Sequence, residues 1–578
     1  MANSAPKSAS GDINADIVIV GAGLFGGLMA WYLRTHLPNK SVALIDSGPV
    51  VDRVEAVKRF KESPEKGGNS AYKTVPWAPI PPENDPAAYY DQKNHDSKKP
   101  LDQIGFGALY MRTVGGTSWH FTGHAERMYP NDFRMKSAYG RGLDWPISYK
   151  TLEPYFAQVE EAWGVAGNNS CVAPTPHPYP LPVVPLTYLD HQVNKAAEAL
   201  NDSIGPLPHC RNSVPYDGRP QCCGNASCRF ICPVGAKYDG SVHVEKAQGL
   251  GAVLYANSVV EKINVGADKK VASLLFKNYT DPAHPVTGTA TAKLFILAAH
   301  AIEIPRLLLM SNGKNTPKGV ANSSDQVGRN LMSMVGINSS GYVPEPVYPF
   351  RGPVNATGVF RELRDGAFRK DYASIGTIII NGGFNPTNGP LKEADDAVDD
   401  NLFGAELRAR VFNKTATQVY LDNSVEMLPN SENRITLSDE IEAATGLPRP
   451  KIDIRIDDYT LDGTYVSWKR TQDILVQMKA SFNGVPIATP TRAAFDDLVA
   501  KQGVQAGAAM IAGTTRMGTD PKTSVVNEWC QSHDHDNLFI AGTGCYVTAG
   551  SVSPSLTAAA IGLRASEYIA TNFKKITG

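Results

Sequence analysis

Four cysteines lie close together in the segment PQCCGNASCRFICPVGA. Cys222, Cys223, Cys228 and Cys232 follow a C-C-x4-C-x3-C spacing. Thiolates at this density on a loop can hold an iron–sulfur cluster, and Cys232-Pro233 is similar to the Cys-Pro ending of bacterial ferredoxin motifs. Zinc and a pair of disulfides are the alternatives, although adjacent cysteines fit a tetrahedral zinc site poorly and disulfides between close neighbours are strained. The spacing alone favours an iron–sulfur cluster and leaves the two alternatives open.

Three glycines near the N-terminus have the spacing of a dinucleotide-binding loop. Gly21, Gly23 and Gly26 form a G-x-G-x-x-G motif, and Asp46 lies 20 residues beyond the last of them. The first glycine permits a tight turn, the second lets the backbone approach a pyrophosphate at the helix N-terminus, and the third lets the helix pack closely on a strand. Asp46 would accept hydrogen bonds from the ribose hydroxyls. The motif predicts dinucleotide binding but does not distinguish FAD from NAD.

The elements needed to position these glycines surround them in the sequence. Residues 15–20 form an apolar, β-branched run typical of a buried parallel strand, and an amphipathic helix follows to about His36. A second strand is expected over residues 41–45, directly before Asp46. Together these segments predict a complete βαβ unit, which the glycine motif requires.

The rest of the chain alternates loops with regular elements. Residues 51–104 are rich in Pro, Lys and Asn and predict long loops that form a lid or an interface. Gly115 and Gly116 predict a tight turn with exposed backbone donors. Helices are expected over residues 151–165, 302–311 and 554–572, and strands over 290–299 and 537–542.

The composition is that of an ordinary soluble protein. The chain has 578 residues, 42% hydrophobic and 20% charged, with a net charge of -1. This length predicts two or more folding units, and the charge gives no reason to expect a nucleic acid or an acidic membrane as partner. No apolar run reaches the roughly 18 residues of a spanning helix, and the polar N-terminus does not read as a signal peptide. Buried free thiols are expected at Cys171, Cys210, Cys530 and Cys545.

Several longer stretches carry a family resemblance. They are TVGGTSWH (113–120), YPNDFRMKSAYGRGLDWPISYKTLEPYF (129–156), YDGRPQCCGNASCRFICPVGAKYDGSVHVEKA (216–247), GVANSSDQVGRNLM (319–332) and LPNSENRITLS (428–438). In this order they resemble the glucose–methanol–choline (GMC) oxidoreductases from end to end. The resemblance is closer still to the flavoprotein large subunits of bacterial membrane-bound gluconate, 2-ketogluconate, fructose and FAD-glucose dehydrogenases.

The resemblance implies a fold that combines α/β and α+β parts. A discontinuous Rossmann-like FAD-binding domain, with the cysteine loop, is expected over residues 1–50, 105–135, 222–340 and 500–578. A substrate or interface domain with an antiparallel sheet is expected over 51–104, 136–221 and 341–499. The implied cofactor is FAD, and the family's nucleotide contacts fall on Gly21, Gly23, Gly26, Asp46, Arg112, Gly115, Gly116, Thr117, Trp119, Val260 and Gly542. Core packing is the alternative for Trp119.

The resemblance also gives the cysteines a role. The relatives carry a three-iron (3Fe-4S) cluster at this place, and its three ligands are expected to be Cys222, Cys228 and Cys232, with Cys223 to spare. Electrons would leave FAD through the cluster to a multihaem cytochrome c subunit, as in a dehydrogenase rather than an oxidase. A small third subunit would supply export, so the implied location is periplasmic and membrane-associated through partner subunits. The implied substrate is the CH–OH group of a sugar, sugar acid or polyol.

The chain departs from the family at the catalytic positions. The family's base histidine aligns with Met510, and its partner His or Asn aligns with Ser553. Methionine cannot take a proton at neutral pH, and Ser553 before Pro554 reads as a helix N-cap with proline at N1. That helix would still aim its positive end at the flavin. The usual Asp-His after the Gly-Arg-Asn-Leu-Met run is replaced by Ser333 and Met334.

Other residues could handle the proton. His124, paired with Glu126, is one candidate for a relocated base, and a surface or loop position for both is the favoured alternative. Tyr546 is a second candidate. His120 is expected to be structural, and His533 and His535 to be solvated in a turn.

Three functions follow from this pattern. The first is an FAD dehydrogenase of sugars, sugar acids or polyols with a relocated base. The second is an FAD and iron–sulfur oxidoreductase of a different substrate class that needs no strong base. The third is a non-catalytic subunit that relays electrons. Because both the glycine motif and the cysteine set are retained, the first function is favoured.

Overall fold

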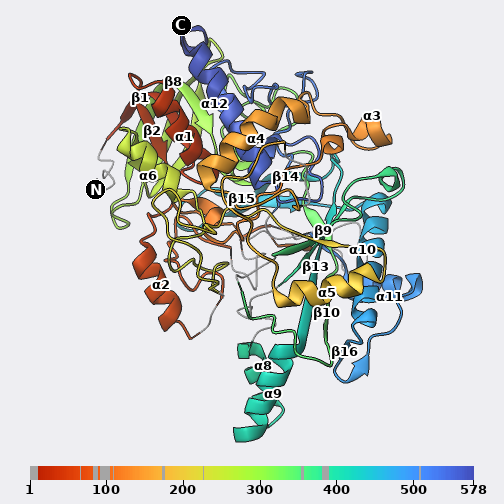
Figure 1. Cartoon of the computed structure of the whole chain (residues 1–578). Helices are drawn as coiled ribbons and strands as arrows, with labels where there is room; N and C mark the ends of the chain where they lie inside the picture. The colour runs from red at the N-terminus through yellow and green to blue at the C-terminus, as the bar shows by residue number, and fades with distance from the viewer. Residues whose placement is uncertain are drawn as a thin grey trace.

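A computed structural model shows two large sheets with helices around them (Figure 1). The structure describes residues 11–64, 67–81, 89–91, 105–107, 110–171, 176–225, 227–352, 357–380, 390–506 and 510–578. Most of the expected loop region before residue 105 therefore lies outside the described residues. Its described part contains a helix, α2 (Arg53–Glu62), so the expectation of loops throughout was wrong there. The α2 helix begins with a local cap, because the Asp52 side chain accepts from the Glu55 backbone N–H.

In the described part of the chain the first sheet has seven strands, and it contains the predicted βαβ unit. Its order is β5-β2-β1-β8-β7-β6, and β19 pairs with β8. The first four of these strands and β19 run parallel, whereas β6 and β7 form an antiparallel extension. The strands are β1 (Ile13–Val20), β2 (Val42–Ile45), β5 (Val253–Tyr255), β6 (Ser258–Val265), β7 (Val271–Asn278), β8 (Val286–Leu297) and β19 (Leu538–Ile540). The carboxyl half of β1 is buried, as expected of a parallel strand covered on both faces.

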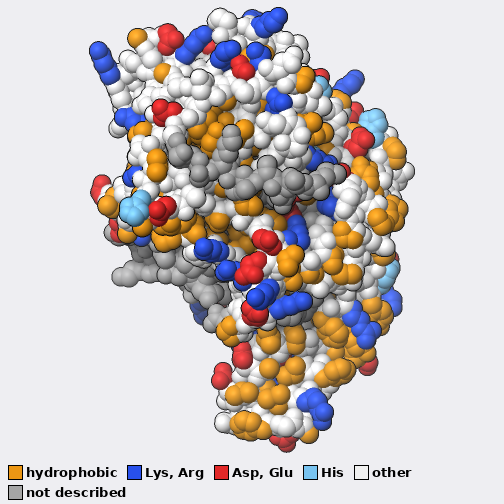
Figure 2. Space-filling model, turned by 90° about the vertical axis from the view of Figure 1, so that its left-hand side faces the viewer, with side chains coloured by type: hydrophobic (Ala, Val, Ile, Leu, Met, Phe, Trp, Pro, Cys, Tyr) orange, Lys and Arg blue, Asp and Glu red, His pale blue; other side chains and the backbone are white. Residues whose placement is uncertain are grey.

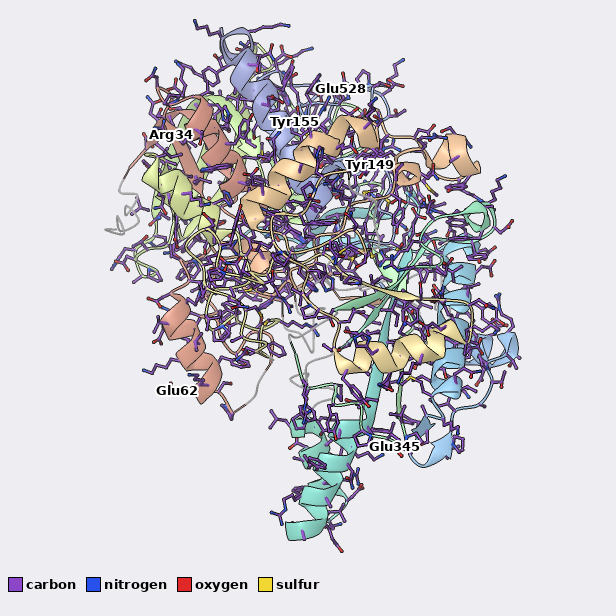
Figure 3. The ribbon with its side chains drawn as sticks, in the orientation of Figure 1. Arg34, Glu62, Tyr149, Tyr155, Glu345 and Glu528 are labelled. Atoms are coloured by element: carbon purple, nitrogen blue, oxygen red, sulfur yellow. The ribbon has the colours of Figure 1, made fainter. Side chains whose placement is uncertain are left out.

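Four helices pack in succession beside this sheet (Figure 1). The α1 helix (Leu24–His36) packs against α6 (Ser241–Gly249) and against α12 (Ser555–Thr577), which runs to the C-terminus. The α4 helix (Tyr149–Trp163) packs on α12 in turn. In Figure 3 Tyr155 of α4 lies beside α12, where its hydroxyl donates to Glu567. The expected helices at 151–165 and 554–572 are thus confirmed within two residues at their starts.

The second sheet is mainly antiparallel and has ten strands among the residues described. Its central path is β17-β16-β10-β13-β12-β11-β4, and β9, β18 and β3 join at one side. These strands are β3 (Gly105–Phe106), β4 (Ile204–Pro206), β9 (Met334–Gly336), β10 (Ser339–Tyr342), β11 (Gly358–Phe360), β12 (Ile375–Ile379), β13 (Gln418–Glu426), β16 (Ser481–Phe482), β17 (Val485–Pro486) and β18 (Gln505–Ala506). The α10 helix (Asp458–Gln477) packs on β13, and α5 (Tyr188–Glu198) packs on α10.

The two sheets match the predicted pair of folding units, although the exact division of the chain stays a prediction. The β9 and β18 strands were assigned to the FAD-binding part, yet they pair within the second sheet. The α4 helix was assigned to the substrate part, yet it packs on α12. The remaining elements are α3 (Met135–Tyr139), α7 (Glu303–Met310), α8 (Pro390–Asp399), α9 (Gly404–Thr417), α11 (Arg492–Gln502), β14 (Arg434–Ile441) and β15 (Pro448–Asp453).

The α8 and α9 helices form a hairpin that projects from the body of the protein (Figure 1). Hydrophobic side chains gather on this projection at the bottom of Figure 2. Those exposed on the two helices and their connection are Leu391, Val398, Phe403 and Phe412. The projection lies away from the first sheet, so it does not contribute to the nucleotide end of the molecule.

Candidate active site

One cavity of about 690 Å³ is lined by residues from both sheets. At one end it is bordered by Gly21, Gly23 and Asp46 of the first sheet's βαβ unit. At the other end it is bordered by β9, β12 and β13 of the second sheet. Several of the predicted nucleotide contacts therefore face the same continuous space as Met510 and Ser553.

The glycine loop is packed so closely that side chains do not fit. Gly21 has φ +100°, a conformation that L side chains rarely adopt. A Cβ on Gly26 would lie 1.8 Å from the carbonyl oxygen of Gly21, and one on Gly116 would lie 3.2 Å from Cα of Gly23. The backbone of the α1 N-terminus is thus open to the cavity, as an anionic pyrophosphate requires.

Asp46 fixes this loop as well as lining the cavity. Its Oδ2 accepts from the backbone N–H of Ala22 at 2.8 Å, and its Oδ1 accepts from Gly48 at 2.9 Å. Burial raises the pKa of the Asp46 carboxyl, while these two hydrogen bonds and Arg112 oppose the rise. The carboxylate therefore lies at the end of β2, where the ribose of a dinucleotide is expected.

The 112–120 turn places some predicted residues on the cavity and others behind it. Arg112, Gly116 and Thr117 line the cavity, and so does Val260 of β6. Trp119 instead lies with Tyr72 and Phe230 in a buried cluster, with 2% of its surface exposed. Its indole Nε1 donates to the carbonyl of Val114 at 2.9 Å.

This position agrees with the packing alternative for Trp119 rather than with a flavin contact. A Cβ on Gly115 would lie 2.4 Å from the Trp119 indole nitrogen, so this glycine makes room for the ring. Gly115 is left-handed with φ 91°. Gly542 also has a positive φ, and a Cβ there would approach Phe25, which borders the cavity. Gly26, Gly115 and Gly542 shape the walls without lining the space themselves.

Four buried charged residues balance one another in the wall near Arg112. The Arg112 guanidinium donates to Glu442 at 3.0 Å, and Arg306 lies 3.1 Å from the same carboxylate and 3.0 Å from Glu303. Although burial opposes ionisation, the two arginines together lower the pKa of Glu303 to about 2. This part of the wall is therefore ionised and held rigid, with two cations against two anions.

The cysteine loop borders the same cavity. Arg229 and Phe230, which lie between Cys228 and Cys232, are among its lining residues. A hydrogen bond from the buried Cys228 thiol lowers the pKa of Cys232 to about 5. The backbone N–H of Lys237 also donates to the Cys232 sulfur at 3.4 Å. This arrangement favours a thiolate at Cys232.

The other two cysteines of the loop differ in exposure. Cys222 is partly buried and accepts from the backbone N–H of Gly224 at 3.4 Å, whereas Cys223 is exposed. All eight cysteines are free, so the disulfide alternative was wrong for this structure. Among the residues described, no three His, Cys, Asp or Glu side chains lie close enough to share one metal ion.

Both positions of the family's catalytic pair lie on the cavity. Met510 and Ser553 are lining residues, as is Met334, another of the departures from the family pattern. Pro554 caps α12, which begins at Ser555, so the expected cap at Ser553 was one residue too early. The start of α12 still points its backbone dipole toward the cavity, as the sequence predicts.

Glu126 is held beside Ser553. Its carboxylate accepts from the Ser553 backbone N–H and forms an ion pair with Arg364 at 3.1 Å. Burial raises the pKa of Glu126, and Arg364 opposes that rise. His124, which also lines the cavity, lies edge-on to His209 with 5.3 Å between ring centroids.

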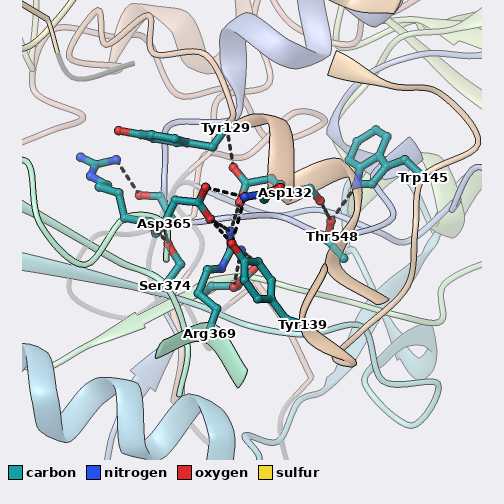
Figure 4. Close-up of polar contacts among 12 residues, drawn as sticks. Tyr129, Asp132, Tyr139, Trp145, Asp365, Arg369, Ser374 and Thr548 are labelled. Atoms are coloured by element: carbon teal, nitrogen blue, oxygen red, sulfur yellow. Dashed lines mark hydrogen bonds and ion pairs between the residues drawn. The ribbon is translucent and has the colours of Figure 1, made fainter. Parts of the chain in front are cut away.

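A buried polar network lies between the second sheet and neighbouring segments of the chain (Figure 4). Arg369 lies 2.7 Å from Asp132 and 2.9 Å from Glu426 of β13, and it also contacts Asp365 at 3.2 Å. Thr548, close to Ser553 in the chain, donates to the backbone carbonyl of Asp132 at 2.7 Å. The network ties the 129–133 segment and the approach to α12 to the second sheet.

Comparison with known proteins decides the family. The chain is 35% identical over 573 residues to the fructose dehydrogenase large subunit of Gluconobacter japonicus, an alignment that covers 97% of this chain and 99% of the relative. A family model described as GMC oxidoreductase matches residues 429–562. The chain belongs to the GMC oxidoreductase family. It is accordingly an FAD-dependent oxidoreductase that acts on CH–OH donors.

More distant relatives agree with this family. The chain is 27% identical to 2-methyl-1,2-propanediol dehydrogenase of Mycolicibacterium austroafricanum, which covers 84% of this chain and 86% of the relative. It is 23% identical to the gluconate 2-dehydrogenase flavoprotein of Pantoea cypripedii over 80% of each chain. Among solved structures, pyridoxine 4-oxidase from Mesorbium loti has the same fold with a TM-score of 0.62 and 17% identity, over 96% of this chain and 99% of that one. The GMC fold predicted from the sequence is thus confirmed.

The structure of this GMC oxidoreductase places several histidines and one tyrosine differently from the sequence predictions. His124 and Glu126 are 6% and 3% exposed, so the surface position was wrong, whereas both residues do lie in a loop outside the named helices and strands. His535 is buried and accepts from the Ala321 backbone N–H at 3.1 Å, so the expectation that it is solvated was also wrong. Tyr546 is buried, and its hydroxyl donates to the carbonyl of Pro554 at 2.5 Å rather than lining the cavity. His120, expected to be structural, lines the cavity, and burial lowers its pKa to about 3.

Sequence reasoning missed several ionisable residues of this GMC cavity, and Asp422 is one of them. Asp422 of β13 lines the cavity, and burial raises its pKa to about 6. Its partners are Arg229 of the cysteine loop and Asn338, which precedes β10. No motif marks Asp422, because its surroundings arise only when three distant segments pack together. The one available signal was the alternation of apolar and polar residues along β13, which places Asp422 on the polar face.

Proposed function

We propose that this chain is the flavoprotein subunit of a dehydrogenase that oxidises a CH–OH group of a sugar, sugar acid or polyol and passes the electrons through an iron–sulfur cluster to a cytochrome or another acceptor. The observation that carries the proposal is the single cavity, which joins the glycine loop, the positions of the family's catalytic pair and the cysteine loop. The substrate class is supported by the relatives named fructose dehydrogenase and gluconate 2-dehydrogenase.

FAD fits the nucleotide end of the cavity. The backbone of Gly21 and Gly23 would lie against the pyrophosphate, Asp46 against the ribose, and Val260 against the adenine. The 112–117 turn and the start of α12 would lie along the flavin. When bound, FAD supplies the two-electron acceptor, and an iron–sulfur cluster supplies the one-electron outlet.

In this proposal the cysteine loop holds a cluster of the 3Fe-4S type, although in the described part of the chain the side chains do not yet converge on one metal position. Cys222, Cys228 and Cys232 would be its ligands, because Cys223 is exposed and the other three are at least partly buried. Several positive charges surround the sulfurs: Lys237 and Arg53 both act on Cys232, and the Arg53 guanidinium donates to its carbonyl at 3.0 Å. Such charges and N–H donors stabilise an anionic thiolate cluster.

The remaining elements of the proposal concern partners and location. The relative's name, large subunit, supports a chain that works in a complex. We place the chain in the periplasm, attached to the membrane through a multihaem cytochrome c subunit and accompanied by a small export subunit. None of the described helices has both the length and the apolar character of a membrane span.

Anaerobic mixing tests the enzymatic part of the proposal. The purified holoprotein is mixed with D-fructose, D-gluconate, D-glucose and sorbitol while the flavin absorbance is followed. Bleaching by at least one of them is expected. If dithionite bleaches the flavin and none of these compounds does, the function as an electron relay replaces this proposal.

Single cysteine variants test the cluster. Cys228→Ser is expected to lose the electron paramagnetic resonance signal of an oxidised three-iron cluster and most of the iron, because a buried ligand is removed. Cys223→Ser is the matched control and should keep both, since this thiol is exposed. Equal iron content in the two variants, or no iron in the wild-type protein, would refute the cluster assignment.

A further inference from the structure

Asp422 is fixed on a strand face that borders the cavity. Tyr420, Asp422 and Ser424 alternate along β13, and all three line the cavity. Alternate residues of a strand share one face, so these side chains form a polar row opposite the nucleotide end. The β13 strand pairs with β10 on one side and with β12 on the other, which holds this row in register.

Asn338 orients the Asp422 carboxylate. Its Oδ1 accepts from the backbone N–H of Asn423 at 2.9 Å, so its amide group can be placed in only one way. The amide nitrogen donates to the Tyr420 hydroxyl at 2.8 Å and to the Asp422 carboxylate. The carboxylate thus has a defined direction before any substrate is present.

The charges around Asp422 suit a proton acceptor near neutral pH. Burial raises the pKa of this carboxyl to about 6, although the Arg229 cation and the Asn338 amide oppose the rise. The other titratable neighbour is Tyr420 on the same strand, whose own pKa is raised by burial and by Asp422. A base with a pKa just below the working pH is ionised and still binds a proton well.

The other candidates are less suited to this role. Met510 occupies the family's base position, but a thioether takes no proton at neutral pH. The Glu126 carboxylate is already held by Arg364 and by the Ser553 backbone. The Tyr546 hydroxyl is engaged with the Pro554 carbonyl, and Tyr546 does not line the cavity.

We propose that Asp422 is the proton acceptor of this enzyme and takes the place of the family's histidine. The substrate's C–H and O–H bonds break and a C=O bond forms. The hydroxyl proton passes to the Asp422 carboxylate, and the C–H hydrogen leaves with its electron pair to the flavin of bound FAD. Arg229 and Asn338 position the carboxylate. The inference rests on the proposed function, since it assumes a CH–OH substrate.

The test compares Asp422→Asn with Asp439→Asn in the holoenzyme. Asp439 is exposed on β14 and serves as the matched control. Flavin bleaching by D-fructose, or by whichever sugar of the panel bleaches the wild type, is followed by anaerobic stopped flow between about pH 5 and about pH 8. The wild-type rate should fall as the pH drops below about 6, where the Asp422 carboxylate takes up a proton. Asp422→Asn should be at least about 100-fold slower at every pH, with the half-saturating sugar concentration changed less than about threefold.

Two further measurements make the result decisive. Arg229→Gln should move the acid limb of the rate profile to higher pH, because the cation that favours the ionised carboxylate is lost. Infrared difference spectra between the two pH limits should show a carboxyl C=O band in the wild type and in Asp439→Asn that is missing from Asp422→Asn. This band does not depend on turnover, and the FAD content of each variant shows that it has folded.

Different results would refute the role of Asp422 and the proposed function. If the wild type bleaches and Asp422→Asn keeps its rate and pH profile, or loses only affinity for the sugar, Asp422 is not the base. The same conclusion follows if His124→Ala, and not Asp422→Asn, removes the acid limb. If no sugar, sugar acid or polyol bleaches the wild type, the proposed function fails and the role of Asp422 falls with it.

Discussion

Replacement of Gly26 by alanine should damage the nucleotide end of the cavity. The added Cβ would lie 1.8 Å from the Gly21 carbonyl oxygen, whereas ordinary contacts begin at 3.4 Å. The α1 helix or the glycine loop must therefore move by about 1.6 Å, and neither side of the contact is a flexible side-chain end. Overpacking of this kind costs about 1–3 kcal/mol and occasionally more. Because the loop would carry the pyrophosphate, FAD affinity should fall by at least about tenfold, or about 1.4 kcal/mol.

Gly562→Ala is the matched control for this prediction. Gly562 lies within α12, and a Cβ there would be 3.6 Å from the Met29 side chain, which is an ordinary contact. Alanine also favours a helix interior by roughly 0.5–1 kcal/mol over glycine. The measurements are the FAD released per mole of purified protein, the FAD concentration needed to saturate the apoprotein, and the thermal midpoint. A Gly26→Ala protein with full FAD content and a wild-type midpoint would refute the packing argument.

Three further predictions concern the buried polar groups near the site. Arg369→Met should destabilise the protein by about 3–5 kcal/mol, because it leaves the Asp132 and Glu426 carboxylates buried without their cation, and an unchanged urea midpoint would contradict this. Burial raises the pKa of Asp132 to about 6, above its ordinary value. The stability that its proton contributes is therefore present at low pH and is lost as pH rises through about 6. Asp132→Asn should flatten the dependence of the urea midpoint on pH. Trp119→Phe removes the hydrogen bond to Val114 at a cost of about 1 kcal/mol and should leave the FAD content unchanged. Loss of FAD from this variant would instead indicate that the Trp119 ring contacts the flavin.

The nucleotide end of the site could be predicted from the sequence because its signals are local. Gly21, Gly23 and Gly26 are close together in the sequence, and they lie where β1 ends and α1 begins. Asp46 follows β2 directly, so its position at the strand end is fixed by the same βαβ unit. The structure adds that its carboxylate also binds the loop. That second role depends on tertiary distances and has no sequence signal.

The substrate end could be predicted only where the family pattern covered it. Met510 and Ser553 were found by alignment with that pattern, and the structure brings both to the cavity. The partners of Glu126 were not predictable, because Arg364 comes from a distant segment of the second domain. Asp422 was missed for the same reason: burial raises its pKa, and its two partners, Arg229 and Asn338, come from distant segments rather than from a motif.

The departures from the family pattern now have a common location. Met510, Ser553 and Met334 border the same cavity, while the glycine loop at its other end keeps every residue of the motif. A scaffold that had lost its function would accumulate changes at both ends, since neither end is needed for core packing alone. The changes instead surround a wall that contains a half-buried carboxylate at Asp422, oriented by Asn338. Loss of the histidine together with the presence of this carboxylate is the pattern of a base moved from the α12 side of the flavin to the sheet that faces it.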